Sequence, residues 1–370
     1  MSPEPNHTVD VALAKTRIAV IEVNPEHRQQ VTRALNPLYD VAAYAQFDHA
    51  LDCLAEAPPC VVLLDEAALP RRGGNPVALL RAQLAGVPII RTLNHALAHL
   101  GSVAADADAC LEKPFRRSSL IRAISGQVTR SVEKGWQALP DQYRDSLQRS
   151  VESFNAISDQ IDRGEPLVYQ AINEACSPLV DAVSKHDFKV ILDNVKGHDN
   201  YSYVHSLRVA TLLSLFGHTI GLKGDDLSLL ATGGLVHDIG KATIPQEVLN
   251  KPGRLNDAEL EVMRSHVPRA IDYLSLCETL PKGVVTIAAQ HHEKINGEGY
   301  PMGLRNGELN ELARMASIVD IFSALTDRRV YKEPMAPEAA LALMTDRMAG
   351  EIDLALLALF KGMLLDAVAC

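Results

Sequence analysis

The first third of the chain alternates short apolar runs with amphipathic segments. The apolar runs stand at 18–21, 61–64 and 87–90. Buried parallel strands have this continuous apolar pattern because both faces of their sheet are covered. Between the runs, segments 26–36 and 47–56 repeat apolar residues at helical spacing. The alternation predicts a doubly wound α/β domain over residues 17–130, preceded by an N-terminal tail at 1–16.

The segment that follows has a single apolar stripe. Between 140 and 164 the stripe consists of Tyr143, Leu147, Val151, Phe154, Ile157 and Ile161. Steps of three or four residues predict one long helix with one apolar face. Two interpretations stay open: the face packs on its own domain, or it pairs with a second copy and makes a homodimer. We place this helix in a helical linker at 131–190.

The rest of the chain has no alternating pattern that would predict strands. Helical stretches run to the C-terminus and break at 251–253, 297–303 and 333–334. Residues 191–370 are therefore expected to form an all-α domain. The predicted fold class is a multi-domain chain with an α/β doubly wound domain followed by an all-α one.

Composition narrows the function classes. A chain of 370 residues with 47% hydrophobic residues fills ordinary globular cores, and its net charge of -10 argues against binding a nucleic acid polymer. Six cysteines are scattered without a paired motif, which is typical of a reducing compartment. No apolar run approaches the length of a membrane span. We expect a cytoplasmic protein that does not enter the membrane.

Histidine and aspartate side chains in the helical half are candidate metal ligands. They are His205, His237, Asp238, His266, His291, His292 and Asp320. Imidazoles and carboxylates without thiolates suit divalent transition metals, and we expect two ions of iron or manganese, with nickel or zinc as alternatives. Asp238 is the candidate bridge, because one carboxylate can give an oxygen to each ion. Neighbouring side chains diverge by about 100° on a helix, so the adjacent pairs must lie near helix ends.

The order and spacing of these ligands resemble a known family. The matching segments are HSLRV at 205–209, HDIGK at 237–241, LNKPG at 249–253 before His266, HHEKINGEGYP at 291–301, and VDIFSALT at 319–326. They are similar to the HD-GYP proteins, a branch of the HD superfamily of metal-dependent phosphohydrolases that degrade the bacterial messenger cyclic di-GMP. The resemblance covers roughly residues 190–345.

The resemblance implies a division of the ligands between two ions. One ion would be held by His205, His237, Asp238 and Asp320, and the other by Asp238, His266, His291 and His292. Asp238 and Lys241 would be the catalytic residues. Substrate contacts are implied for Tyr300, Arg314, Arg329 and Lys332. The alternative for Tyr300 is a purely structural role in a turn. The alternative for the basic residues is that they are solvated surface side chains.

One departure from the family bears on the number of ions. Some members add a third ion through a Glu one helical turn before the first His, and here that position is Tyr201. We therefore expect two ions, with three as the alternative.

The resemblance implies hydrolysis of cyclic di-GMP to linear pGpG, with GMP from a slower second cleavage. Two cations held close together stabilise the charge of a phosphodiester under attack by water. The alternatives are a receptor or adaptor that binds cyclic di-GMP with little turnover, and a phosphodiesterase for another cyclic nucleotide. Expected protein partners are a sensor histidine kinase and GGDEF-type or other signalling proteins.

The N-terminal domain resembles response-regulator receivers. Asp65 stands in the place of the phosphoacceptor, Thr92 of the switch hydroxyl and Lys113 of the phosphate-binding lysine. The usual pair of acids after the first strand is here Glu22 followed by Val23, so binding of Mg²⁺ should suffer. Phosphorylation of Asp65 that regulates the metal site, and a pseudo-receiver that only dimerises or docks a partner, both stay open.

Overall fold

The computed structural model describes residues 16–36, 38–94, 106–195, 201–249, 251, 253–327 and 334–369. The chain divides into two compact units, up to Ser131 and from Val132 onward. The elements of the first unit are β1 (Arg17–Ile21), α1 (Pro25–Leu35), β2 (Asp40–Tyr44), α2 (Phe47–Glu56), β3 (Val61–Asp65), α3 (Pro76–Gln83), β4 (Ile89–Asn94), β5 (Ala109–Lys113) and most of α6 (Arg117–Gly135).

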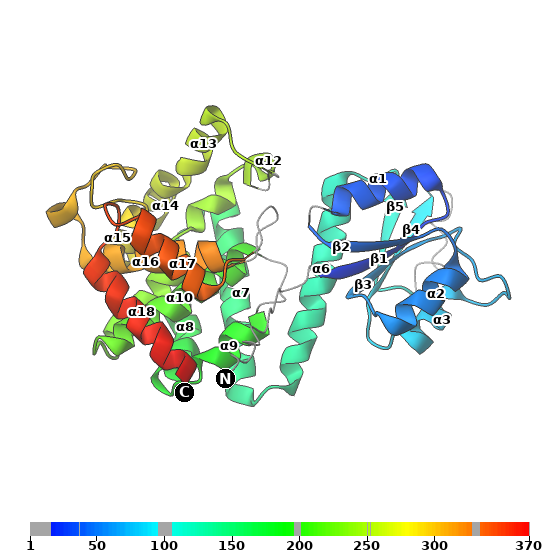
Figure 1. Ribbon diagram of the computed structural model, residues 1–370, viewed down its shortest axis with the longest axis horizontal. Coiled ribbons are helices and arrows are strands. Elements are labelled where there is room, and N and C mark those ends of the chain that lie inside the picture. Colours follow the sequence, from blue (N-terminus) through cyan, green and yellow to red (C-terminus); the bar gives the residue numbers. More distant parts are fainter. Residues whose placement is uncertain are drawn as a thin grey trace, which may run out of the picture. The chain divides into compact units, whose positions relative to one another are not determined.

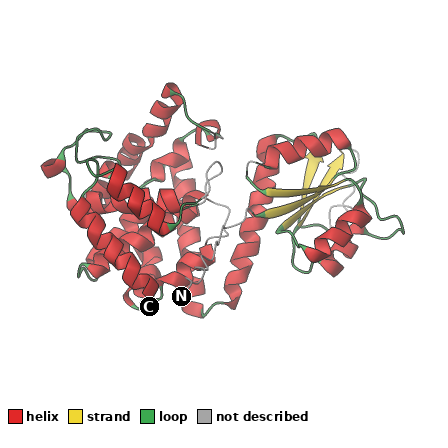
Figure 2. Ribbon diagram, in the orientation of Figure 1, coloured by secondary structure: helices red, strands yellow, loops and turns green. Residues whose placement is uncertain are grey.

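The elements of the second unit are helical in the part of the chain that the structure describes (Figure 2). They are η1 (Trp136–Ala138), α7 (Asp141–Arg163), α8 (Tyr169–Ser184), α9 (Phe188–Val195), α10 (Tyr201–Thr219), α11 (Asp225–Val236), η2 (Ile239–Thr243), α12 (Gln246–Leu249), α13 (Asp257–Arg264), α14 (His266–Leu274), α15 (Lys282–Gln290), η3 (Asn306–Glu308), α16 (Glu311–Thr326), α17 (Pro337–Arg347) and α18 (Leu354–Ala369). Among the described helices, none is both long enough and apolar enough to cross a bilayer.

The first unit is a five-stranded sheet in the order β2-β1-β3-β4-β5, and all its strand pairs are parallel. This order is the flavodoxin-like doubly wound topology that receiver proteins share. Successive strand residues point to opposite faces. Ile18 and Val20 therefore pack with α1 and α6, whereas Ala19 and Ile21 pack with α2 and α3. Figure 1 shows α1 on one side of the sheet and α2 and α3 on the other. The predicted receiver-like α/β domain is confirmed.

The second unit is built around α10, which contributes to two apolar clusters. Tyr203, Leu207 and Ala210 belong to one cluster, and Val209 and Phe216 belong to the other. A helix that is apolar all round must be buried, and α10 packs against α8, α11 and α16. The predicted all-α domain is confirmed, and its central helix carries the first candidate ligand, His205.

Helix α7 packs inside the second unit. Leu147, Val151 and Ile157 are buried in the first cluster of that unit, and Phe154 and Ile161 pack against it. The apolar stripe of this helix is thus covered by its own unit, which is the first of the two interpretations left open by the sequence. Helices α7, α8 and α9 contribute to the same core as the helices that follow, so the segment predicted as a linker forms part of the helical unit.

Candidate metal centre and receiver pocket

Both adjacent ligand pairs lie where a helix ends. Helix α11 ends at Val236, with His237 as its C-cap residue and Asp238 as the N-cap residue of η2. Helix α15 ends at Gln290 with His291 as its C-cap. Because the backbone changes direction there, two successive side chains need not diverge as they do inside a helix. These two helix ends let both members of each pair face one centre.

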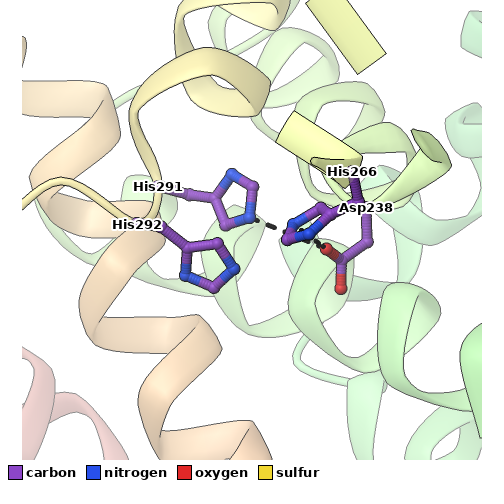
Figure 3. Close-up of side chains that lie close together, drawn as sticks. All are labelled: Asp238, His266, His291 and His292. Carbon is purple, nitrogen blue, oxygen red and sulfur yellow. Dashed lines mark ion pairs between the residues drawn. The ribbon is translucent and has the colours of Figure 1, made fainter. Parts of the chain in front are cut away.

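Asp238 lies at the middle of this centre with its two oxygens facing different groups. Its Oδ2 is 3.3 Å from Nε2 of His237 and 3.7 Å from Nε2 of His205. Its Oδ1 is 3.2 Å from Nε2 of His266 and 3.7 Å from Nε2 of His291 (Figure 3). His205, His237 and Asp238 form one cluster with metal-ligand spacing, and Asp238, His266, His291 and His292 form another.

Asp320 joins the two clusters from α16. Its Oδ1 is 3.0 Å from Nε2 of His205 and 3.8 Å from Nε2 of His237. Its Oδ2 is 3.8 Å from Nδ1 of His292. The side chain of His292 is 25% exposed, in contrast to the other buried histidines, so it marks the open side of the centre. All the ligand candidates predicted from the sequence therefore lie together.

The buried histidines are oriented by bonds at Nδ1. The Nδ1 atoms of His237, His266 and His291 lie 2.7, 2.7 and 2.9 Å from main-chain carbonyl oxygens of the preceding turn. A carbonyl only accepts, so each Nδ1 carries the proton and each Nε2 keeps its lone pair. This is the tautomer that a metal ligand requires.

The donor atoms at the centre fit divalent cations. The Nε2 atoms of His237, His266 and His291 and Oδ1 of Asp238 are buried without a hydrogen-bond partner among the described residues. Buried polar atoms are ordinarily bonded, so several such lone pairs around one point indicate a site for cations. The set of imidazoles and carboxylates suits transition metals.

Electrostatics keep the carboxylates ionised. Burial alone would raise the pKa values of Asp238 and Asp320. Lys241 and neighbouring histidines hold the pKa of Asp238 well below its usual range, and His205 with other histidines does the same for the pKa of Asp320. Burial disfavours a charged His205, yet its hydrogen bonds to Asp320 and Asp327 raise its pKa to about 9. Burial and the adjacent histidine lower the pKa of His292 well below its usual value. The centre is therefore anionic in its oxygens and ready to attract cations.

A loop closes over the second cluster. Gly299 approaches so closely that a Cβ there would lie 2.3 Å from the main-chain nitrogen of Lys294. The ring of Tyr300 stacks on His292 at 4.8 Å, and the guanidinium of Arg264 lies 5.3 Å from the centre of the Tyr300 ring. Tyr300 thus packs on a candidate ligand, and burial raises the pKa of its hydroxyl.

Glu293 anchors this loop, a role that the sequence analysis did not assign. It is 2% exposed and accepts hydrogen bonds from the main-chain N–H groups of Met302 at 2.6 Å, Gly303 at 3.2 Å and Leu304 at 2.9 Å. The sequence signal that could have pointed to Glu293 was its place directly after the candidate ligands His291 and His292. Its partners are main-chain groups up to eleven residues away, so no motif of side chains predicted them.

Gly240 sets the distance between η2 and α14. A Cβ at this position would lie 1.9 Å from the carbonyl oxygen of His266 and 2.9 Å from the main-chain nitrogen of Ala270. Only glycine allows the two backbones to come this close. Gly240 therefore allows His266 to lie next to Asp238.

The predicted catalytic and substrate residues are placed less uniformly. Lys241 is 23% exposed and its ammonium contacts Oδ2 of Asp238. Arg314 does not join the centre: its guanidinium bonds Asp353 at 3.2 Å and the carbonyl oxygens of Leu309, at 3.1 Å, and Asn306. Arg329 and Lys332 lie outside the described residues.

The receiver pocket brings its predicted residues together around Lys113. Lys113 contacts Asp65 and lies 2.8 Å from Glu22, and Thr92 Oγ1 donates to Asp65 at 3.3 Å. Glu22 also accepts from His27 at 2.6 Å, and these bonds lower its pKa although burial opposes this. Mg²⁺ needs free oxygen ligands. The position after Glu22 is a valine, so this pocket offers one carboxylate fewer than the usual pair of acids would.

Comparison with known proteins identifies relatives of part of this chain. A family model described as an HD domain matches residues 183–356. A cyclic di-GMP phosphodiesterase of Pseudomonas aeruginosa is 35% identical over 183 residues, which are 48% of this chain and 44% of that protein.

Two further relatives differ in their named substrate. The 3'3'-cGAMP-specific phosphodiesterase 3 of Vibrio cholerae is 32% identical over 180 residues, covering 49% of this chain and 39% of that protein. The cyclic di-GMP phosphodiesterase response regulator RpfG of Xanthomonas campestris pv. campestris is 34% identical over 139 residues, covering 37% of this chain and 36% of that protein. This chain thus matches less than half the length of each of these curated relatives.

Proposed function

This chain carries a receiver-like domain followed in sequence by an HD domain of the HD-GYP type, and from this premise we propose that it is a metal-dependent phosphodiesterase. Its proposed substrate is cyclic di-GMP, its first product linear pGpG, and GMP follows from a slower second cleavage. The observation that carries this proposal is Asp238, whose two oxygens face separate clusters of histidines. That arrangement suits a carboxylate shared by two cations.

Different residues of the chain would bind the ions, contact the phosphate and shield the centre. His205, His237 and Asp320 would hold one iron or manganese ion with Asp238, and His266, His291 and His292 would hold the other. Such ions supply Lewis acidity and lower the pKa of a bound water, so that hydroxide is available to attack a phosphodiester. Lys241 adds a positive charge beside Asp238, where it favours a phosphate group. The loop at 299–301 closes one side of the centre and limits the entry of bulk water.

A second candidate substrate is 3'3'-cGAMP. The Vibrio cholerae relatives that are named for this substrate are 28–33% identical to this chain, close to the identity of the cyclic di-GMP enzymes. The ligand set is indifferent to the bases, since the metal chemistry acts on the phosphate. The shape of the base pocket decides between the two substrates.

Product analysis tests the proposal. The purified protein, loaded with Fe²⁺ or Mn²⁺, is incubated separately with cyclic di-GMP and 3'3'-cGAMP, and the linear products are separated by chromatography. Metal content is measured on the same samples. Faster formation of pGpG supports the first proposal, and faster cleavage of the mixed dinucleotide supports the second. Tight binding without cleavage under both metals would support a receptor instead.

For the receiver-like domain we propose regulation without phosphorylation. The carboxylates of Glu22 and Asp65 are both bonded to Lys113, and His27 contacts the same oxygen of Glu22 as Lys113 does. Val23 stands where receivers usually have a second acid, so binding of Mg²⁺ beside Asp65 should suffer, and this disfavours phosphorylation. Contact with a partner protein or a second copy of the chain is then the route by which this domain acts.

A further inference from the structure

His205 is oriented differently from the other buried ligands. His237, His266 and His291 stand at helix ends, where main-chain carbonyl oxygens of the last turn accept from Nδ1. His205 lies within α10, whose carbonyl oxygens are used by the helix itself. Its Nδ1 instead lies 3.2 Å from Oδ2 of Asp327.

Asp327 belongs to the same helix face as a candidate ligand. It is the C-cap residue of α16 and follows Asp320 by seven residues, which is two helical turns. The imidazole of His205 therefore lies between two carboxylates of one helix, with Nε2 at 3.0 Å from Asp320 and Nδ1 at 3.2 Å from Asp327. Asp327 is only 7% exposed, so this contact is shielded from water.

Arg208 holds the other oxygen of Asp327. Its guanidinium donates to Oδ1 of Asp327 at 2.8 Å and to Oγ1 of Thr326 at 2.8 Å. Arg208 follows His205 by three residues on α10, so the two side chains share a face. Each oxygen of the Asp327 carboxylate is thus fixed by a separate donor of α10, and the carboxylate has little freedom to turn away from the imidazole.

We propose that Asp327 is a positioning residue of the metal centre, which keeps Nδ1 of His205 protonated and directs its Nε2 towards Asp238 and Asp320. The inference rests on the proposed function. A carboxylate behind a ligating imidazole orients the ring and increases its basicity as a ligand. Here it also ties α10 to α16, two helices that both carry ligands. The carbonyl oxygens that accept from the other histidines also orient their rings, but because these groups are neutral they increase the basicity of Nε2 less.

Metal titration tests this role. Metal-free wild-type protein and Asp327→Asn are titrated with Mn²⁺ by calorimetry, and circular dichroism checks their helix content. We expect Asp327→Asn to weaken binding by about 10- to 100-fold, the range found for such partners of ligating histidines. Arg208→Gln is the matched control: it releases the clamp but leaves the carboxylate behind His205, so its loss should be smaller.

A double-mutant cycle separates positioning from general stability. In a His205→Ala background, Asp327→Asn should cause no further loss of Mn²⁺ affinity, because its effect acts through that imidazole. Equal affinities of wild-type protein and Asp327→Asn, or an equal additional loss in the His205→Ala background, would overturn the inference. Should wild-type protein bind no Mn²⁺ or Fe²⁺ at all, the proposed function falls with it.

A spectroscopic measurement covers the case in which Asp327→Asn does not fold. Nitrogen-15 NMR of histidine-labelled, Zn²⁺-loaded wild-type protein distinguishes a protonated Nδ1 from a bare one, and His205→Gln assigns the signal by its absence. A protonated Nδ1 with a strongly hydrogen-bonded proton is expected. A bare Nδ1 at His205 would contradict the positioning role while leaving the phosphodiesterase proposal in place.

Discussion

Replacing Gly240 with alanine tests whether the close approach of η2 to α14 sets the geometry of the centre. The new Cβ would lie 1.9 Å from the carbonyl oxygen of His266, whereas ordinary contact begins at 3.4 Å. The two segments must therefore separate by about 1.5 Å. Asp238 and His266 stand on opposite sides of this contact with ligand atoms 3.2 Å apart. Whichever segment yields, a candidate ligand moves.

The expected loss is large because metal sites tolerate little displacement. Ligand distances vary by only about 0.2 Å in well-formed sites, so Gly240→Ala should lose the ion held with His266. A misplacement of about 1 Å costs on the order of 100-fold in rate, and overpacking costs about 1–3 kcal/mol of stability. Metal content per chain, kcat for cyclic di-GMP and urea unfolding measure these three effects.

Gly350→Ala is the matched control for this substitution. A Cβ at Gly350 meets no atom within 4 Å and the backbone there does not require glycine. We expect unchanged metal content and a change in unfolding free energy within about 0.5 kcal/mol. If Gly240→Ala kept the metal content and kcat of the wild-type protein, the reasoning from backbone contact to ligand position would be refuted.

Four further outcomes follow from the same contacts. Asp238→Asn should abolish hydrolysis while circular dichroism keeps its helical spectrum; undiminished turnover would exclude the bridging role. Glu293→Gln should raise KM and lower the unfolding free energy by about 1–3 kcal/mol, since one of the two acceptor oxygens becomes an NH₂ group and the main-chain N–H bonded there loses its partner, with metal content unchanged; an unaltered KM would contradict the anchoring of the loop. Acetyl phosphate and Mg²⁺ should add no phosphate to Asp65 by mass spectrometry, whereas an added phosphate would restore the regulated-receiver interpretation. Removing metal with a chelator should abolish hydrolysis and lower the melting temperature, because ligands that bind only the folded state stabilise it; calorimetry with and without Mn²⁺ checks this.

Local pattern was sufficient for the element types and the ligand candidates. The strands β1 and β3 and the helices α1, α2 and α7 follow directly from the spacing of apolar residues. Strand β2 was not predicted because it lies at the sheet edge and its burial is interrupted, so it has no continuous apolar run. The ligand set was predictable because residue type and chain order carry it.

By itself, the sequence determined an α/β domain followed by a helical one and the identity of the side chains that meet at Asp238. Tertiary structure alone decided what surrounds them. The apolar stripe of α7 packs within its own unit, and Glu293 bonds the main chain of the loop that follows it. Asp327 contacts Nδ1 of His205, and His27 contacts Glu22. The physical reason is distance along the chain: periodicity reports neighbours three or four residues apart. A hydrogen bond between α10 and the end of α16 depends on how separate helices pack.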